Sequence, residues 1–187
     1  MLDLIIRNVN LPDGRKGFDI AIKDGVIVDV AVDLKGEGKR EIDATGRLAS
    51  PPFVDSHFHM DTTLTYGQPR VNESGTLLEG IALWRELKPN LTVENIKARA
   101  MQLCHWAIAR GTLAIRSHVD ISDDRLLAVN ALLEVREEIK PYIDLQLVGF
   151  PQDGYLRYPG SADNLKRALD LGVDVIGGIP HFERTMA

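Results

Sequence analysis

The first fifty residues carry short apolar runs in which hydrophobic and polar positions alternate, a pattern typical of β-strands. These runs lie at residues 4–6, 18–22 and 26–30. Asp24-Gly25 separates the second run from the third and indicates a tight hairpin, because glycine tolerates the positive φ that such turns require. Residues 1–50 are therefore expected to form a small β module, and we identify no catalytic chemistry in it.

After residue 50, apolar runs alternate with stretches in which hydrophobic residues recur at helical spacing. We expect strands at 51–58, 112–120, 143–150 and 173–179, a loop at 62–75, and helices at 77–88, 92–110, 122–140 and 161–171. The first of these strands is expected to be buried, because it begins as a continuous apolar run. Strands that alternate with helices predict an α/β fold with a parallel sheet built from right-handed crossovers.

Hydroxyl side chains and glycines mark the ends of the expected helices. Thr92, Ser122 and Ser161 each precede a helical pattern and are expected to cap its N-terminus. Gly111 and Gly172 follow two of the helical patterns and are expected to end those helices.

The composition is that of an ordinary soluble globular chain, with 44% hydrophobic and 26% charged residues and a net charge of −5. An acidic balance without a basic run gives no support for nucleic-acid binding, and no apolar run approaches the length of a membrane span. Cys104 is the only cysteine, which excludes a disulfide within the chain. We expect a cytoplasmic protein without a nucleic-acid or membrane partner.

Two histidines stand one residue apart at the end of the first expected strand after residue 50. Side chains alternate across a strand, so His57 and His59 should point to one side and Phe58 to the other. Two imidazoles that project together form adjacent ligands for a divalent transition metal. An isolated His-x-His is equally consistent with two polar residues where a strand leaves the sheet.

The other expected strands also end in polar side chains. They are His118 and Asp120, then Gln152, then His181 and Glu183. In a parallel β/α barrel these positions converge on one mouth, where catalytic groups are found. We interpret His118 as a residue that satisfies hydrogen bonds or supports a ligand, rather than as a ligand itself. His181 is interpreted in the same way, with Glu183 as its partner, and Gln152 also fits an ordinary turn.

These motifs resemble those of the cytosine deaminase family of the amidohydrolase superfamily, and the likeness covers nearly the whole chain as an N-terminal half. The His-x-His element is shared across the superfamily, whereas the motifs at 150–152 and 179–183 point to the cytosine deaminase branch. The matching motifs are Val54-Asp55-Ser56-His57-Phe58-His59-Met60-Asp61-Thr62-Thr63, Gly67-Gln68-Pro69, Ser74-Gly75-Thr76-Leu77, Ser117-His118-Val119-Asp120, Phe150-Pro151-Gln152 and Ile179-Pro180-His181-Phe182-Glu183.

The resemblance implies hydrolytic deamination of cytosine or a related aminopyrimidine, and so a role in pyrimidine metabolism. It implies one divalent metal, Fe²⁺ or Zn²⁺, with His57 and His59 among its ligands, and Gln152 hydrogen-bonded to the amide edge of the substrate. The family's acid and base groups are expected after Ala187, since no His-x-x-Glu occurs in this chain. No catalytic residue is therefore assigned within it.

The resemblance also predicts the architecture. Residues 1–50 are expected to be the N-terminal part of a small β-sandwich module, and residues 51–187 the first half of a (β/α)₈ TIM-type barrel. A complete barrel takes about 250 residues, and roughly 137 remain after residue 50, enough for about four β/α units.

We expect such a half-barrel to be inactive alone and to form a homo-oligomer, because an open sheet exposes unpaired edges. Two alternatives are kept. One is an aminotriazine amidohydrolase of the same superfamily, and the other is a non-catalytic half-barrel that acts only in assembly or binding.

Overall fold

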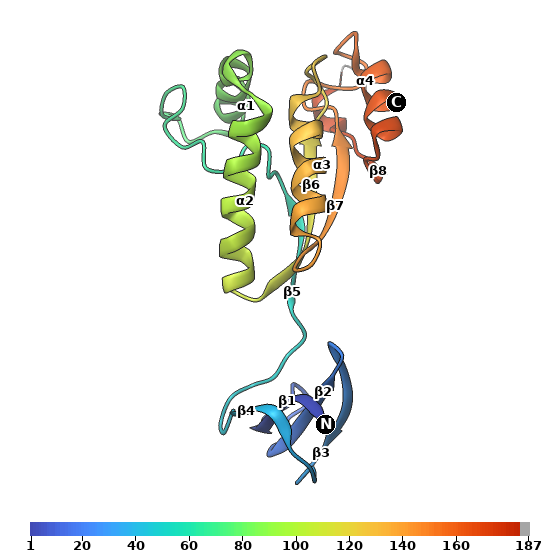
Figure 1. Ribbon diagram of the computed structural model, residues 1–187. Coiled ribbons are helices and arrows are strands. Elements are labelled where there is room, and N and C mark those ends of the chain that lie inside the picture. The colour runs from blue at the N-terminus through green and yellow to red at the C-terminus, as the bar shows by residue number, and fades with distance from the viewer. Residues whose placement is uncertain (184–187) are drawn as a thin grey trace. The chain divides into compact units, whose positions relative to one another are not determined.

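The computed structural model describes residues 1–183, apart from the side chain of His181. The chain divides into two compact units, Met1–Pro51 and Pro52–Ala187 (Figure 1).

The N-terminal unit is a four-stranded sheet in the order β3-β2-β1-β4. Its strands are β1 (Leu2–Val9), β2 (Phe18–Lys23), β3 (Val26–Ala31) and β4 (Gly38–Asp43). β2 pairs antiparallel with both neighbours, while β1 and β4 run parallel. Asp24 and Gly25 both have positive φ (51° and 75°), so they form the hairpin turn that the sequence predicts. A small apolar cluster around Val9 and Ile20 forms the core.

The second unit is a parallel sheet in which strands alternate with helices, as expected for the first part of an α/β barrel. The sheet order is β5-β6-β7-β8, and each pair of neighbours is parallel. The strands are β5 (Phe53–Phe58), β6 (Thr112–Asp120), β7 (Asp144–Phe150) and β8 (Val175–Ile176). The helices are α1 (Leu77–Leu87), α2 (Val93–Ala109), α3 (Leu127–Ile139) and α4 (Ser161–Leu171), with short 3₁₀ helices η1 (Lys88–Asn90) and η2 (Pro180–Phe182).

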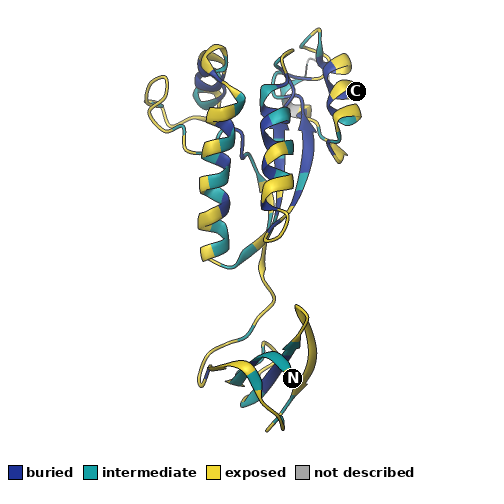
Figure 2. Ribbon diagram, in the orientation of Figure 1, coloured by how far each residue is buried: buried dark blue, intermediate teal, exposed yellow. Residues whose placement is uncertain are grey.

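The helices cover one face of this sheet. α2 and α3 lie side by side along it (Figure 1), and their inward faces are buried together with the strands behind them (Figure 2). Ile96 of α2, Leu132 of α3 and Val119 of β6 are completely inaccessible to solvent and belong to one apolar cluster. This packing fixes the strands in place. The polar residues that follow their carboxyl ends are therefore held in defined positions.

β5 differs from the buried strand that its sequence suggests. Phe53 and Val54 are 66% and 68% exposed, so the prediction of a buried strand is wrong for its first residues. The physical reason is position, because β5 lies at the edge of the sheet with β6 as its neighbour in the described part of the chain. β8 is also shorter than predicted, with two residues in place of the run at 173–179.

One of the three predicted helix caps is confirmed. The hydroxyl of Thr92 accepts a hydrogen bond from the backbone N–H of Asn95 at the start of α2 (3.2 Å). Ser122 does not cap α3, which begins five residues later after Leu126. Ser161 is the first residue of α4, and Gly160 occupies the capping position.

Both serine hydroxyls bind the loop after β7 instead of a helix end. The Ser122 hydroxyl accepts a hydrogen bond from the backbone N–H of Asp153 (3.0 Å), and the Ser161 hydroxyl donates to the carbonyl of Gly154 (2.9 Å). These tertiary contacts explain why the two predicted caps are wrong.

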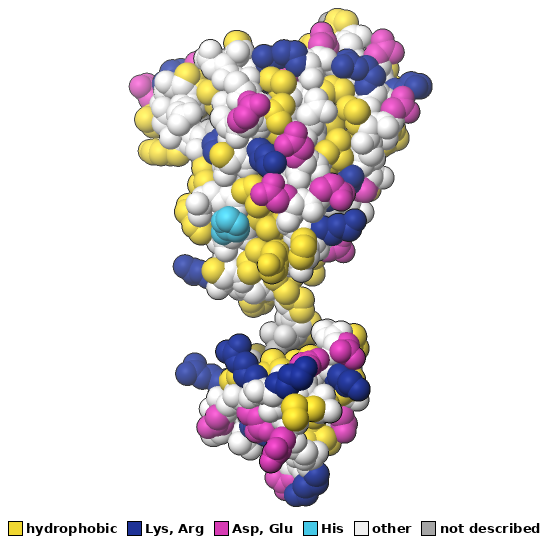
Figure 3. Space-filling view, viewed as in Figure 1, with side chains coloured by type: hydrophobic (Ala, Val, Ile, Leu, Met, Phe, Trp, Pro, Cys, Tyr) yellow, Lys and Arg dark blue, Asp and Glu magenta, His cyan; other side chains and the backbone are white. Residues whose placement is uncertain are grey.

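Acidic and basic side chains are interspersed on the visible face of each unit, without a single-sign patch there (Figure 3). Of the helices that the structure describes, none combines the length and the apolar character needed to cross a bilayer.

Candidate active site

His57 and His59 lie at the carboxyl end of β5, with their ring centroids 5.4 Å apart. Phe58, between them, packs against the helix-side core, so the two imidazoles occupy the opposite face of the sheet. The pairing register shifts between Asp55 and Phe58, which marks a bulge or irregularity in the strand just before the histidines. The strand thus brings together the two residues that the sequence predicts as metal ligands.

His118 of β6 joins this pair. Its ring stacks on His57 with a centroid distance of 4.0 Å and lies 5.5 Å from His59. Phe150 of β7 closes the cluster, with its ring edge-on to His59 (5.3 Å) and His118 (5.6 Å). Three strands therefore contribute aromatic rings to one cluster at the carboxyl ends of the strands.

The role predicted for His118, to satisfy hydrogen bonds or to support a ligand, stays a prediction. Its Nδ1 is buried and has no hydrogen-bond partner among the described residues. The ring packs against those of His57 and Phe150. A buried polar atom without a partner is typical of a site that binds a water molecule or an ion.

The local environment keeps the imidazole of His59 neutral. Burial, together with the neighbouring His118 and His57 rings, which disfavour an additional positive charge, lowers its pKa to about 4. Burial and His57 also lower the pKa of His118. A neutral imidazole keeps a free lone pair, which is the form that binds metal ions.

The buried carboxyl group of Asp61 connects the segment that follows His59 to the end of β6. Asp61 is completely buried and accepts a hydrogen bond from the backbone N–H of Asp120 at the end of β6 (2.9 Å). The Ser117 hydroxyl accepts another from the backbone N–H of Met60 (3.0 Å). Burial raises the pKa of Asp61 to about 7. The sequence motif contains Asp61, but spacing alone gives no signal of this supporting role.

A pocket of about 350 Å³ opens beside the histidines and includes both His59 and Gln152 in its lining. Its apolar wall comes from α1, where Ile81, Trp84 and Leu87 face it. Gln152 reaches it from the turn after β7. The volume is in the range of small-molecule sites, and a mostly apolar lining with a few polar groups is typical of them.

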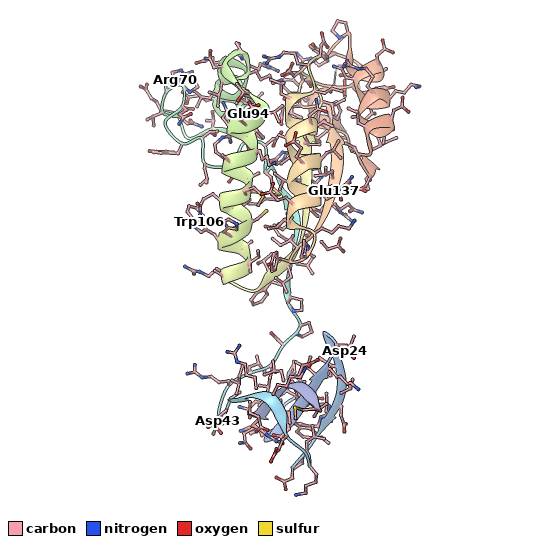
Figure 4. All side chains as sticks on the ribbon, viewed as in Figure 1. Asp24, Asp43, Arg70, Glu94, Trp106 and Glu137 are labelled. Atoms are coloured by element: carbon pink, nitrogen blue, oxygen red, sulfur yellow. The ribbon has the colours of Figure 1, made fainter. Side chains whose placement is uncertain are left out.

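The loop at 62–75 forms the outer wall of this pocket and is tied to α1 by charge. Arg70, which is labelled in Figure 4, pairs with Glu79 (2.7 Å) and Glu86 (2.9 Å) on that helix. Hydrogen bonds from Ser74 and the Arg70 guanidinium lower the pKa of Glu79 to about 2, so the carboxylate stays charged at neutral pH.

The remaining predicted positions do not complete a metal site within the described residues. No three His, Cys, Asp or Glu side chains there are arranged to hold a metal ion. The His181 side chain lies outside the described part, so its predicted pairing with Glu183 is not addressed. The Glu183 carboxylate accepts hydrogen bonds from the backbone N–H groups of Tyr155 and Leu156.

Both a protein family and a curated protein match this chain by sequence. The sequence model of the amidohydrolase family matches residues 40–187. N-isopropylammelide isopropyl amidohydrolase of Pseudomonas sp. (strain ADP) is 36% identical over an alignment of 186 residues, which covers 95% of this chain and 45% of that protein.

Two solved structures share the fold over nearly the whole chain. 5-Methylcytosine deaminase from Klebsiella pneumoniae, liganded with phosphonocytosine, superimposes with a TM-score of 0.90 and 42% identity over 97% of this chain and 45% of that one. N-isopropylammelide isopropylaminohydrolase from Burkholderia multivorans ATCC 17616 gives a TM-score of 0.80 and 29% identity over 95% of this chain and 45% of its own. The chain spans about 45% of the length of each of these relatives.

Proposed function

Because this chain belongs to the amidohydrolase family, we propose that it carries part of the active site of a metal-dependent hydrolase that deaminates cytosine or a related aminopyrimidine. His57 and His59 are the proposed metal ligands, and Gln152 is the proposed substrate-binding residue. The observation that carries the proposal is that His59 and Gln152, from the ends of β5 and β7, line one pocket.

The chemistry of the two histidines suits a divalent transition metal. Members of the amidohydrolase superfamily are metal-dependent. His57 and His59 lie on one side of the strand end, and His59 is neutral at physiological pH. Imidazole nitrogen is a common ligand for both Zn²⁺ and Fe²⁺, which are the proposed metals. Catalytic zinc sites normally use three protein ligands, so this pair by itself should bind metal weakly.

The proposed reaction replaces the exocyclic amine of the ring with oxygen from water and releases ammonia. A bound metal would supply Lewis-acid activation of the attacking water. Gln152 would fix the orientation of the ring, because an amide both donates and accepts and so matches a carbonyl next to a ring nitrogen. Ile81, Trp84 and Leu87 would exclude bulk water from the ring's apolar surface. The acid and base groups of the reaction are not assigned to this chain.

One alternative function is supported by a particular observation. The 36% identity to an amidohydrolase named for N-isopropylammelide favours an aminotriazine substrate as the second candidate. A non-catalytic binding or assembly module is the remaining alternative, and a turnover measurement distinguishes it from the other two.

A chimera tests the proposal directly. This chain would replace the matching 45% of Klebsiella 5-methylcytosine deaminase, and turnover of cytosine, 5-methylcytosine and N-isopropylammelide would be measured with Zn²⁺ or Fe²⁺. We expect deamination of the pyrimidines by the chimera and none by the isolated chain. Preference for the triazine would support the second candidate. A folded, metal-loaded chimera without turnover of any of the three would contradict an enzymatic role.

Metal binding by the isolated chain provides a matched test of the ligand assignment. His57→Ala and His59→Ala should each abolish weak Co²⁺ or Zn²⁺ binding in a titration, whereas His105→Ala, on the exposed side of α2, should leave it unchanged. Equal binding by all three variants would contradict the assignment.

A further inference from the structure

A buried lysine joins the ends of two strands next to the pocket. Lys88, the first residue of η1, places its ammonium 2.7 Å from the carboxylate of Asp120 and 3.0 Å from that of Asp153. The same ammonium donates a hydrogen bond to the carbonyl of Ser122 (3.2 Å). Asp120 ends β6 and Asp153 lies in the turn after β7, so one side chain connects two strand ends with the helical segment that follows α1.

Each carboxylate also holds a part of the pocket. The Trp84 indole N–H donates to the same oxygen of Asp120 that faces Lys88 (2.7 Å). Asp153 directly follows Gln152, and its own backbone N–H donates to the hydroxyl of Ser122. Trp84 and Gln152 both line the pocket, so Lys88 is linked to the apolar wall through Asp120 and to Gln152 through the adjacent Asp153.

The ion pair between Lys88 and Asp120 is largely shielded from solvent. The Asp120 side chain is 4% exposed and that of Lys88 is 12% exposed. Burial alone would lower the pKa of Lys88, but the charges of Asp120 and Asp153 raise it, so the amine remains protonated. Among the described residues, Lys88 is the only cation paired with Asp120, and a buried carboxylate that loses such a partner is strongly disfavoured. Arg85 contributes a second, more exposed cation, but to Asp153 rather than to Asp120.

We propose that Lys88 is a positioning residue of the pocket, which sets the place of Gln152 through Asp153 and that of Trp84 through Asp120. The inference rests on the proposed function for the identity of the ligand, although the positions of Gln152 and Trp84 can be measured without any ligand. Displacement of a binding group by about 1 Å can cost on the order of a hundredfold in rate, so a modest shift of this turn should be detectable.

The experiment compares Lys88→Met with Lys97→Met in the full 187-residue chain. Lys97 is a matched control, because it also bridges two carboxylates, Glu134 and Glu138 (3.1 and 2.9 Å), but on the outer surface of α2 and α3. In the ligand-free protein, Lys88→Met should speed hydrogen exchange of the amides of Asp153 and Gly154 at least tenfold and shift the indole N–H resonance of Trp84. Trp106, which projects from α2 into solvent, is the internal reference for that resonance (Figure 4).

Binding provides the second measurement, with cytosine as the added compound. We expect its Kd to rise about tenfold or more in Lys88→Met and to stay unchanged in Lys97→Met. Leu132→Ala removes packing at a core residue that does not line the pocket and should lower the Tm without changing the Kd, which separates positioning from general loss of stability. Should Lys88→Met fail to fold, Asp153→Asn weakens the same link while Ser122 still holds the turn, and it should show the same changes at smaller amplitude.

The outcomes distinguish this inference from the proposed function. Unchanged exchange at Asp153 and Gly154 with an unchanged Trp84 resonance would overturn the role of Lys88, whatever binds in the pocket. Equal cytosine affinity of the wild type and Lys88→Met would overturn it as well. A wild type that binds no cytosine, but in which Lys88→Met still loosens the turn and moves Trp84, would contradict the proposed substrate and support the positioning role.

Discussion

Asp19 shows how one buried charge organises the N-terminal unit. Its carboxylate accepts hydrogen bonds from the backbone N–H groups of Asn8 (3.0 Å) and Leu34 (3.2 Å) and pairs with Arg7 (2.9 Å). Burial by itself would raise the pKa of Asp19, but these donors outweigh it, and the pKa lies below its ordinary value of 3.8. The folded state therefore favours the charged form.

This lowered pKa predicts how the unit responds to acid. A carboxyl whose pKa is lower in the folded state stabilises that state above its unfolded pKa, near 3.8, and loses this contribution as the pH falls through the folded value. Asp19→Asn should lower the free energy of unfolding by about 2 kcal/mol at pH 7, the magnitude of hydrogen bonds to a charged group, and by progressively less below pH 4. Urea unfolding followed by NMR at the amide of Ile20, which belongs to this unit, measures it.

Asp13→Asn is the control for this prediction. Asp13 forms an exposed pair with Arg15, so its loss should leave the free energy of unfolding nearly unchanged. Equal effects of the two substitutions at pH 7 would contradict the argument from burial.

At the scale of elements, the sequence predicts structure well where the cause is local. The hairpin at Asp24-Gly25 and the cap of α2 at Thr92 depend only on the turn or on the first helical residues, and both are confirmed. Ser122 and Ser161 have the same local pattern as Thr92, yet their hydroxyls bind the loop after β7. Their partners lie far along the chain, and no local rule can choose between a helix end and such a distant contact.

The same distinction applies to the candidate site. Alternation along a strand is local, and it correctly predicts that His57 and His59 share one side. Their role as ligands stays a prediction. The importance of Lys88 has no local signal, because a lysine at the end of a helix ordinarily interacts with the helix dipole. Only the fold brings Asp120 and Asp153 to it.

The cap of α2 gives a prediction for a single element. Thr92→Ala removes the hydroxyl that accepts the N–H of Asn95 and should lower the free energy of unfolding by about 1 kcal/mol. Thr92→Ser keeps the hydroxyl and should cost much less. Chemical denaturation of both variants, monitored by circular dichroism at helix wavelengths, measures the difference, and equal losses would show that the hydroxyl is not the cause.

At the scale of the whole molecule, the parallel sheet exposes β5 as one of its two edge strands in the described part of the chain. β5 has β6 as its neighbour on one side, and no described strand pairs with its other side. Phe53 and Val54 expose large apolar side chains on this edge strand. An apolar strand with unpaired backbone groups is a ready template for pairing with another chain, and natural proteins commonly block such edges with charged residues.

We therefore predict that the isolated chain self-associates through β5, and that Val54→Lys shifts it toward the monomer by placing a charge on the open edge. Leu171→Lys is the matched control, because Leu171 is a similarly apolar and exposed residue but lies at the end of the helix α4 rather than on the strand β5. Sedimentation velocity across a range of micromolar concentrations should show oligomers for the wild type and Leu171→Lys, and mainly monomer for Val54→Lys. A compact monomer for the wild type at all concentrations would contradict association, whereas oligomers that persist in Val54→Lys would place the interface elsewhere.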